Sequence, residues 1–440
     1  MDLLDHPEAL QLLADADLSA ADVRSCAQRL EVFAQRYLPL FHRAEQRPHA
    51  LTVLRGKLSG LQRKTTEPIA TQASQQRRPL QLFVGAGGWD DDAVLAELRR
   101  HVAEEIGDPD GVFVLDGSGF PKKGDASCGV ARQWCGRLGK VDNCQVGAFL
   151  GYAGRRGKAL LGARLYLSKD WIADPARRAQ THVPEAVTFQ EVWRLALGLL
   201  DAAAPVVPGS WVVGDDEFGR CSELRAQLRQ DDWLYVLDVP CNTLVREPTE
   251  RRPPTRPGGK PRLPVFERVE AWVARQPAGR WRTVTVREGA KGPIQVHVLL
   301  AMVQAKEDDG CIGARERLVV LRSLEKQPQT WYTLSNARQA KRPVLARVHG
   351  ARHRIEELLQ AGKGEVGLGQ YEVRSWVGWH HHMTLSLLAL WFLEVERLRL
   401  GGKNPSRDRA TSPTGVHGTA ARTERQRRTD RRGSQPRAAA

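Results

Sequence analysis

Three short segments of the chain each place a carboxylate at the edge of a regular element. Residues 112–116 and 211–215 are apolar runs that finish in an aspartate, the pattern of a buried strand followed by a turn. Residues 352–356 open a segment with helical spacing that reaches Lys363. Two strand-end aspartates and one helical glutamate are the acidic set of a site that cuts phosphodiester bonds with two metal ions. This set constrains the fold strongly, because three distant segments have to meet.

The helical segment places four polar residues on one face. Steps of three, four and seven residues separate His349, Arg352, Glu356 and Lys363, and on a helix such steps return to the same side. The ordinary alternative is a solvated face held by ion pairs. Likewise, a strand-end Asp often does no more than start a turn.

A cluster of Asp116, Asp215 and Glu356 would repel itself unless divalent cations neutralised it. Mg²⁺ suits such a site, because its preferred ligands are oxygens with water completing the shell. Asp216 and Glu217 follow Asp215 directly and are alternative acids for the second position.

Residues 119–124 follow a strand as a phosphate loop would, but Asp125 stands where that loop needs a lysine. Nucleotide binding is therefore not expected here, and Lys122 and Lys123 are instead candidates to hold DNA phosphates near Asp116. His380–His382 do not form a metal site by our interpretation, because consecutive helical side chains point about 100° apart.

The net charge of +15 indicates a polyanionic partner, with nucleic acid the default. Residues 401–440 hold ten Lys and Arg against three acids, so this tail contributes +7 of that charge. The remaining chain is only mildly basic. The tail has no aromatic residue and, apart from alanines, one aliphatic residue, Val416, so we expect it to be disordered.

The seven cysteines include no pair with the spacing of a zinc ribbon or redox motif, and they favour a reduced cytoplasmic protein. The N-terminus is acidic and lacks the features of a signal peptide. No apolar run approaches the roughly 18 residues of a membrane span, so no membrane partner is expected.

The predicted fold class is α/β, with alternating strands and helices in the middle of the chain. We expect a helical N-terminal region over residues 1–108 and the first part of a catalytic core over 109–241. A β-rich insertion with a Pro/Arg-rich linker follows over 242–338, and residues 339–400 supply the rest of the core with the glutamate helix. The basic tail occupies 401–440.

Within these regions, strands are expected at 144–151, 160–167 and 233–239, and helices at about 188–202 and 223–230. In the insertion, strands are expected around 281–286, 294–302 and 316–322, with a turn between the first two at 289–292. Residues 246–264 hold six prolines and five arginines, which indicates a stiff exposed linker.

Several collinear motifs resemble the DDE transposases of bacterial insertion sequences. They are residues 115–124 (LDGSGFPKKG), 129–133 (GVARQ), 139–145 (GKVDNCQ), 211–219 (WVVGDDEFG) and 371–376 (YEVRSW). The similarity runs from about residue 28 to 400. It is greatest to the group with the Y-x2-R-x3-E-x6-K signature, and within it to the "seven-oh-one" branch.

The resemblance implies an RNase H-like core with Asp116 on the first strand, Asp215 after the fourth and Glu356 on the following helix. The signature falls on His349, Arg352, Glu356 and Lys363, with His349 in place of the tyrosine. The tail departs from the family, as a frameshift in a decaying element would produce.

The sequence thus predicts a transposase in which Asp116, Asp215 and Glu356 bind two Mg²⁺ ions, with Mn²⁺ as a substitute. Its expected partner is double-stranded DNA: the terminal inverted repeats, contacted by the helical N-terminal region, and the target. A homodimer is expected in the synaptic complex, and the nucleoid is the expected location.

Arg352, Lys363 and His349 are expected to contact DNA, and Trp281 of the insertion is a candidate for stacking on a flipped base, although packing of the insertion is the favoured role. Two alternatives stay open: an RNase H-like nuclease without strand transfer, and an inactive DNA-binding relic.

Overall fold

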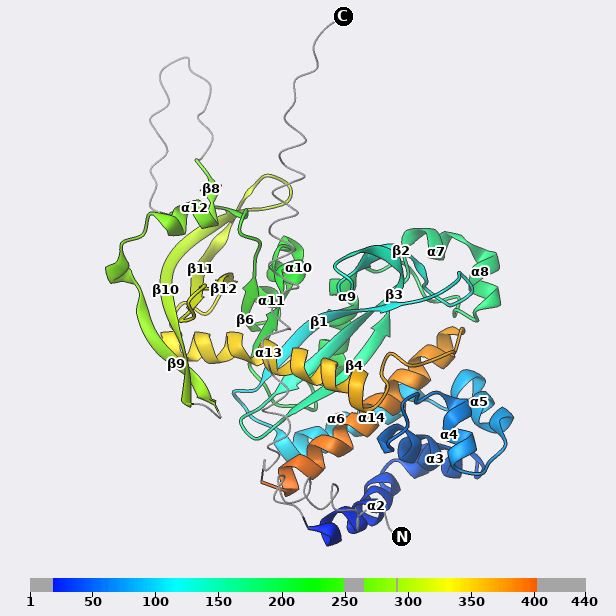
Figure 1. Cartoon of the computed structure of the whole chain (residues 1–440). Helices are drawn as coiled ribbons and strands as arrows, with labels where there is room; N and C mark the ends of the chain where they lie inside the picture. Colours follow the sequence, from blue (N-terminus) through cyan, green and yellow to red (C-terminus); the bar gives the residue numbers. More distant parts are fainter. Residues whose placement is uncertain (1–18, 249–264, 290–291, 402–440) are drawn as a thin grey trace, which may run out of the picture.

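The computed structural model describes residues 19–248, 265–289 and 292–401. Residues 1–18 of the expected helical N-terminal region, most of the Pro/Arg-rich linker and residues 402–440 of the basic tail therefore lie outside the described residues. The architecture is mixed α/β and is built on one twelve-stranded sheet with the order β2-β3-β1-β5-β6-β12-β11-β10-β7-β8, where β4 also pairs with β3 and β9 with β10 (Figure 1).

The central part of this sheet is a meander followed by two parallel strands. β1 (Val112–Pro121), β3 (Lys140–Ala153) and β4 (Lys158–Leu165) are antiparallel neighbours. β5 (Trp211–Gly214) pairs in parallel with β1, and β6 (Leu234–Asp238) pairs in parallel with β5. The expected α/β core is confirmed in this arrangement, because two buried parallel strands need helical crossovers.

The first strand is longer than expected, and several strands, β2 among them, were not predicted. β1 continues beyond Asp116 to Pro121, because the long β3 supplies pairing partners as far as Cys144. The prediction that Asp116 ends its strand was therefore wrong. β2 (Ala131–Cys135), which no expectation covered, pairs with the start of β3.

Helices cover both faces of the central strands. An added Cβ at Gly151 of β3 would meet Ile355 of α13 (Arg342–Glu365), and one at Gly162 of β4 would meet Leu199 of α9 (Val192–Ala203). Gly151 is opposite Val114 of β1, whereas Gly162 is opposite Leu150, the residue before Gly151. Because successive strand residues face opposite sides, α13 and α9 lie on opposite faces.

The connections between the parallel strands are helical. They are α7 (Lys169–Ala173), α8 (Pro175–Gln180) and α9 between β4 and β5, then α10 (Asp216–Gly219) and α11 (Ser222–Gln230) between β5 and β6. The helices expected at 188–202 and 223–230 are thus present, with shifted boundaries.

The β-rich segment continues the same sheet. Its elements are β7 (Leu244–Arg246), β8 (Glu267–Arg268), α12 (Val269–Ala274), β9 (Arg282–Gly289), β10 (Gly292–Lys306), β11 (Ile312–Ser323) and β12 (Thr330–Ser335). β12 pairs with β6, which joins these strands to the core. The segment also has its own apolar cluster around Trp272, Leu299 and Leu318. Buried Glu316 of β11 forms ion pairs with Arg225 and Arg229 of α11, at 3.3 and 3.4 Å, and so ties this segment to the core.

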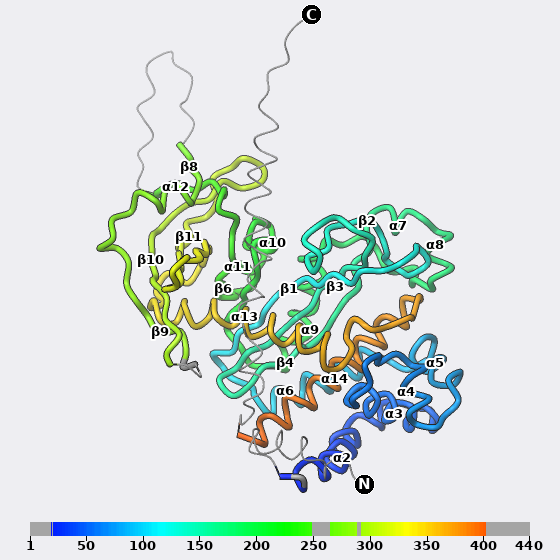
Figure 2. The backbone as a smooth tube through the Cα atoms, in the orientation of Figure 1, coloured from blue at the N-terminus to red at the C-terminus, as the bar shows by residue number. Residues whose placement is uncertain are grey.

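Helices from both ends of the described chain pack together beside β4. They are α2 (Ala20–Gln35), α3 (Gln46–Leu58), α4 (Thr66–Gln72), α5 (Arg77–Ala86), α6 (Asp91–Ile106) and the apolar α14 (Trp376–Arg399). Figure 2 shows the N-terminal helices grouped against α14. Asp90 caps α6 by accepting from the N–H groups of Asp92 and Ala93.

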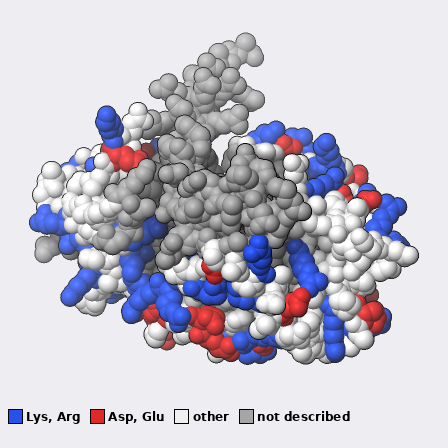
Figure 3. All heavy atoms as spheres, turned by 60° about the horizontal axis from the view of Figure 1, so that its bottom comes forward, with Lys and Arg blue, Asp and Glu red and all other residues white. Residues whose placement is uncertain are grey.

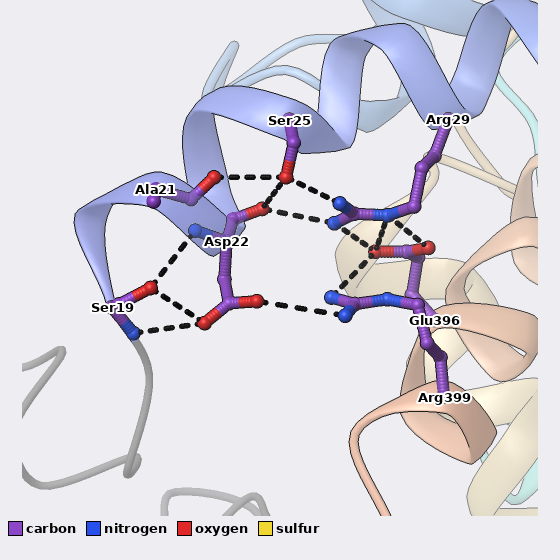
Figure 4. A network of polar contacts seen from close by, with 7 residues as sticks. All are labelled: Ser19, Ala21, Asp22, Ser25, Arg29, Glu396 and Arg399. Atoms are coloured by element: carbon purple, nitrogen blue, oxygen red, sulfur yellow. Dashed lines mark hydrogen bonds and ion pairs between the residues drawn. The ribbon is translucent and has the colours of Figure 1, made fainter.

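A polar network fastens α2 to the end of α14 (Figure 4). Arg29 donates to both carboxylate oxygens of Glu396, with Nη2 2.6 Å from Oε2. Ser19 caps α2 through a reciprocal pair of hydrogen bonds with Asp22, and Arg399 lies 3.5 Å from the Asp22 carboxylate. Charged contacts thus order the first described helix. None of the helices in residues 19–248, 265–289 and 292–401 is both long and apolar enough to cross a bilayer.

Candidate active site

Asp116 lies on β1, and Asp215 directly follows β5, the parallel neighbour of β1. The β1–β5 pairing ends with Leu115 opposite Gly214, and each aspartate is the next residue of its own strand or turn. Asp215 also caps α10, because its Oδ1 accepts from the N–H groups of Glu217 at 2.9 Å and Phe218 at 3.4 Å. Asp215 thus caps a helix, an ordinary role for an aspartate that follows a strand, and it also lies at the end of the two parallel strands.

Glu356 lies on α13, the helix that covers the Asp116 face of the sheet. Val114 and Asp116 alternate onto one face of β1, and Gly151, opposite Val114, is covered by Ile355 of α13. Asp116 therefore points to the side of the sheet that is covered by α13. Figure 1 shows α13 crossing the central strands. Glu356, the next residue after Ile355, has a side chain that is 44% exposed.

The three carboxylates share one electrostatic environment. Burial raises the pKa of Asp116 to about 7, and the charges of Asp215 and Glu356 add to the shift. Burial also raises the pKa of Asp215 to about 6, against the opposing charge of Arg352. For Glu356, burial alone would raise the pKa, but hydrogen bonding to His353 and the charge of Arg352 lower it. The site therefore concentrates negative charge that a cation would relieve.

A fourth carboxylate, which the sequence reasoning missed, organises the helix. Asp238 at the end of β6 accepts from His349 Nε2 at 3.0 Å and forms an ion pair with Arg352. Arg352 also donates to Glu356 Oε1 at 2.5 Å. Burial would raise the pKa of Asp238, but the charges of His349 and Arg352 lower it overall. Asp238 could have been identified from the sequence, because it is a carboxylate at the end of the strand expected at 233–239.

The donor set fits a hard divalent cation, because it consists of carboxylate oxygens that repel one another. Among the described residues, no group of three or more His, Cys, Asp or Glu side chains is arranged as a ready-made metal site. Both oxygens of Glu356 have partners: Oε1 contacts Arg352, and Oε2 lies 3.7 Å from His353 Nδ1. Glu356 would have to exchange these partners to join Asp116 and Asp215 around an ion.

The remaining helix residues differ in their surroundings. His349 contacts Asp238 and lies edge-on to Trp331, with ring centroids 5.7 Å apart. Lys363 has its ammonium 5.7 Å from the centre of the Phe120 ring. Burial lowers the pKa of Lys363, against the attraction of Asp116. Lys363 is thus near the carboxylates, without an ion-pair partner among the residues that the structure describes.

The two lysines of the first motif lie in different environments. Lys122 is half-buried, donates to the Tyr371 carbonyl at 3.1 Å and lies 3.3 Å above the Tyr371 ring. Lys123 is exposed. The segment around them begins as the last residues of strand β1.

Trp281 precedes β9 and is not its first residue. It packs, half-buried, against the apolar cluster of the β-rich segment, and Arg322 lies 4.2 Å from its ring centre. These contacts favour the packing role.

The other acidic and imidazole candidates serve local structure. Asp216 lies 3.5 Å from Arg220 one helical turn on, and Glu217 is exposed. His380, His381 and His382 are buried in α14, and each contacts a different backbone carbonyl, at 3.0, 3.0 and 3.1 Å. The prediction that they share no ion agrees with this.

A family model described as DDE superfamily endonuclease matches residues 36–293, more than half of the chain. The chain belongs to this family. DDE endonucleases act on DNA and generally use divalent metal ions. The matched segment contains Asp116 and Asp215 but ends before α13, so Glu356 is a candidate on geometry alone. No curated protein sequence matches the chain.

Proposed function

We propose that this DDE endonuclease is a transposase of the Y-x2-R-x3-E-x6-K group, "seven-oh-one" branch, which cuts and joins DNA at the ends of an insertion sequence. One observation carries the proposal: Asp116 and Asp215 directly follow the last residue pair of two adjacent parallel strands, and α13, which carries Glu356, covers the face of the sheet to which Asp116 points. The charges of Asp215 and Glu356 both act on Asp116, which supports their assignment to one site.

In this proposal, Asp116, Asp215 and Glu356 hold two Mg²⁺ ions. Such ions would activate water, or later a 3′-hydroxyl, and would stabilise the leaving oxygen. Arg352 and Lys363 contact phosphates beside the scissile bond. One site can thus serve both cleavage and joining, because the two reactions differ only in the nucleophile.

The helical region within residues 1–108 is proposed to contact the terminal inverted repeats, the β-rich segment at 242–338 to assist at the cut, and a homodimer to pair two ends. The reaction would take place in the bacterial cytoplasm, at the nucleoid.

The test is cleavage of a duplex that carries the flanking inverted repeats, with Mg²⁺ present. Asp116→Ala, Asp215→Ala and Glu356→Ala should each abolish cleavage while binding of the duplex persists. Joined product separates a transposase from a nuclease without strand transfer. A parent protein that binds but never cuts would be the inactive relic. Full cleavage by one alanine variant would remove that residue from the site.

A further inference from the structure

A groove at the start of α13 is lined by four cations and no carboxylate. Its walls come from β9, β10, β11 and the segment that enters α13, and its volume is about 490 Å³. The cations are Arg282, Arg317, Lys341 and Arg342, and the remaining lining residues are apolar or neutral. Four like charges around one groove repel each other unless an anion lies between them.

These cations lack the ion pairs with carboxylates that are found on other parts of the surface. The face in Figure 3 shows Lys and Arg mixed with Asp and Glu. Paired arginines elsewhere include Arg155, 2.6 Å from Asp110. Within residues 19–248, 265–289 and 292–401, by contrast, the groove cations form no ion pair.

The groove is built by backbone contacts that leave the positive charges unneutralised. Arg317 donates to the carbonyls of Arg338 and Ala340, at 2.7 and 2.8 Å. Arg282 donates to the Trp281 carbonyl at 2.9 Å. The Nε of Arg342 is buried and has no hydrogen-bond partner among the described residues. Burial and the charge of Arg342 lower the pKa of Arg317. Arginines held in this way present a fixed positive surface.

The groove and the candidate active site are connected by one continuous helix. Arg342 is the first residue of α13, and Glu356 lies fourteen residues further along it. Fourteen residues make about four turns and about 21 Å, so the two positions return to nearly the same side of the helix. For a duplex whose axis runs parallel to α13, this distance spans about six phosphates of one strand, at about 3.4 Å of axial rise each.

We infer that the groove of Arg282, Arg317, Lys341 and Arg342 binds the phosphate backbone of duplex DNA about six nucleotides from the bond that is cut. The inference rests on the proposed function for the position of the cut, whereas the binding of the backbone stands on the groove itself. The proposed contact is to the phosphate backbone, and phosphate contacts carry no sequence information directly. Its role is to set the register of the duplex along α13.

The test compares single-charge variants in a salt titration of binding to a random duplex of about 30 base pairs, between about 50 and 200 mM NaCl. Lys341→Gln and Arg282→Gln should each flatten the log–log salt slope by about 0.9. Arg194→Gln removes the same charge from α9, on the opposite face of the sheet, and should leave the slope unchanged. Circular dichroism checks that each variant folds. Slopes of the groove variants equal to that of Arg194→Gln would overturn the inference.

A second measurement tests the distance. Single methylphosphonates are placed along an element-end duplex, and cleavage should fall most when the neutral linkage lies about six phosphates from the cut on one side. A uniform response along the strand would contradict the register role. If the groove variants flatten the salt dependence of DNA binding but the parent protein never cuts DNA, the proposed function is wrong and the inference about the groove is supported. If the parent cuts and the groove variants behave as the control, the groove inference alone fails.

Discussion

Asp238 forms an ion pair with Arg352, a residue 114 positions later in the chain, and through it positions the side of α13 that carries Glu356. Burial alone would lower the pKa of Arg352, but the charges of Asp238, Glu356 and the two strand aspartates raise it overall. Arg352 thus remains charged and held between carboxylates.

The first prediction concerns Asp238 as a positioning residue. Asp238→Ala frees Arg352 and His349 and should lower kcat for cleavage by about 10–100-fold, as loss of outer contacts does at metal sites. The KM for DNA should change little, because Asp238 faces the helix and not the substrate. Asp238→Glu should restore part of the rate. Asp201→Asn on α9 is the matched control; an equal loss there, or a change in KM alone, would argue against positioning.

The second prediction concerns metal. The carboxylates of the site repel one another, so Asp116→Asn should abolish cleavage yet raise the Tm of the metal-free protein by about 1–3 °C. Mg²⁺ should raise the Tm of the parent, because it binds the folded state, and should not raise that of the variant. Chelation should reverse the gain. Thermal unfolding with and without Mg²⁺ measures the Tm of the parent and of the variant. An equal rise in Tm with Mg²⁺ for both proteins would show that the ions bind elsewhere.

The third prediction separates two cations on α13. Lys363→Ala should flatten the salt dependence of DNA binding by about 0.9, the effect of one phosphate contact. Arg352→Ala should flatten it less, because Asp238 and Glu356 already neutralise the guanidinium. Its main effect should be on the cleavage rate. Equal slopes for both variants would show that Asp238 and Glu356 do not weaken the phosphate contact proposed for Arg352.

The fourth prediction concerns acid stability. Burial lowers the pKa of His380 to about 3 and that of His381 to about 4. In the unfolded chain these two histidines bind protons below about pH 6.5, whereas in the folded chain burial keeps them neutral to lower pH. The free energy of unfolding therefore decreases as the pH falls from 6.5 to 4. The decrease in the free energy of unfolding approaches about 1.4 kcal/mol per pH unit for each histidine.

Replacing His381 tests this directly. Its ring stacks on Trp89 with centroids 3.6 Å apart, so phenylalanine can occupy the place. Urea midpoints at pH 7.5, 6 and 5 should show a smaller loss on acidification for His381→Phe than for the parent. The exposed His42→Gln is the control. Parallel pH profiles for His381→Phe and the parent would mean that His381 is protonated in the folded state.

The fifth prediction concerns Trp281. Its half-buried packing and the Arg322 contact favour a structural role, so Trp281→Ala should destabilise the protein by about 1–3 kcal/mol. The rate of cleavage of paired ends should decrease only in proportion to the fraction of folded protein. An abasic site beside the cut should then give no rescue. Rescue by the abasic site, with stability unchanged, would establish base stacking instead.

The local patterns of the sequence were enough for much of the framework. Apolar runs predicted the strand that contains Asp116 and the strand that Asp215 follows. The spacing of His349, Arg352, Glu356 and Lys363 predicted one helical face, and these residues are part of a single 24-residue helix. Alternating strands and helices predicted the α/β class. These features depend on periodicity, which is a property of neighbouring residues.

Contacts between distant residues had no such signal. The extension of β1 to Pro121 depends on partners in β3, and the joining of β12 to β6 depends on a register between strands far apart in the chain. The pairing of Asp238 with Arg352 and the four-cation groove arise where separate segments meet. The sequence determined which elements form and which charges they carry. Only the tertiary structure decided which charges meet, because the pKa values and partners of buried groups depend on what other elements pack against them.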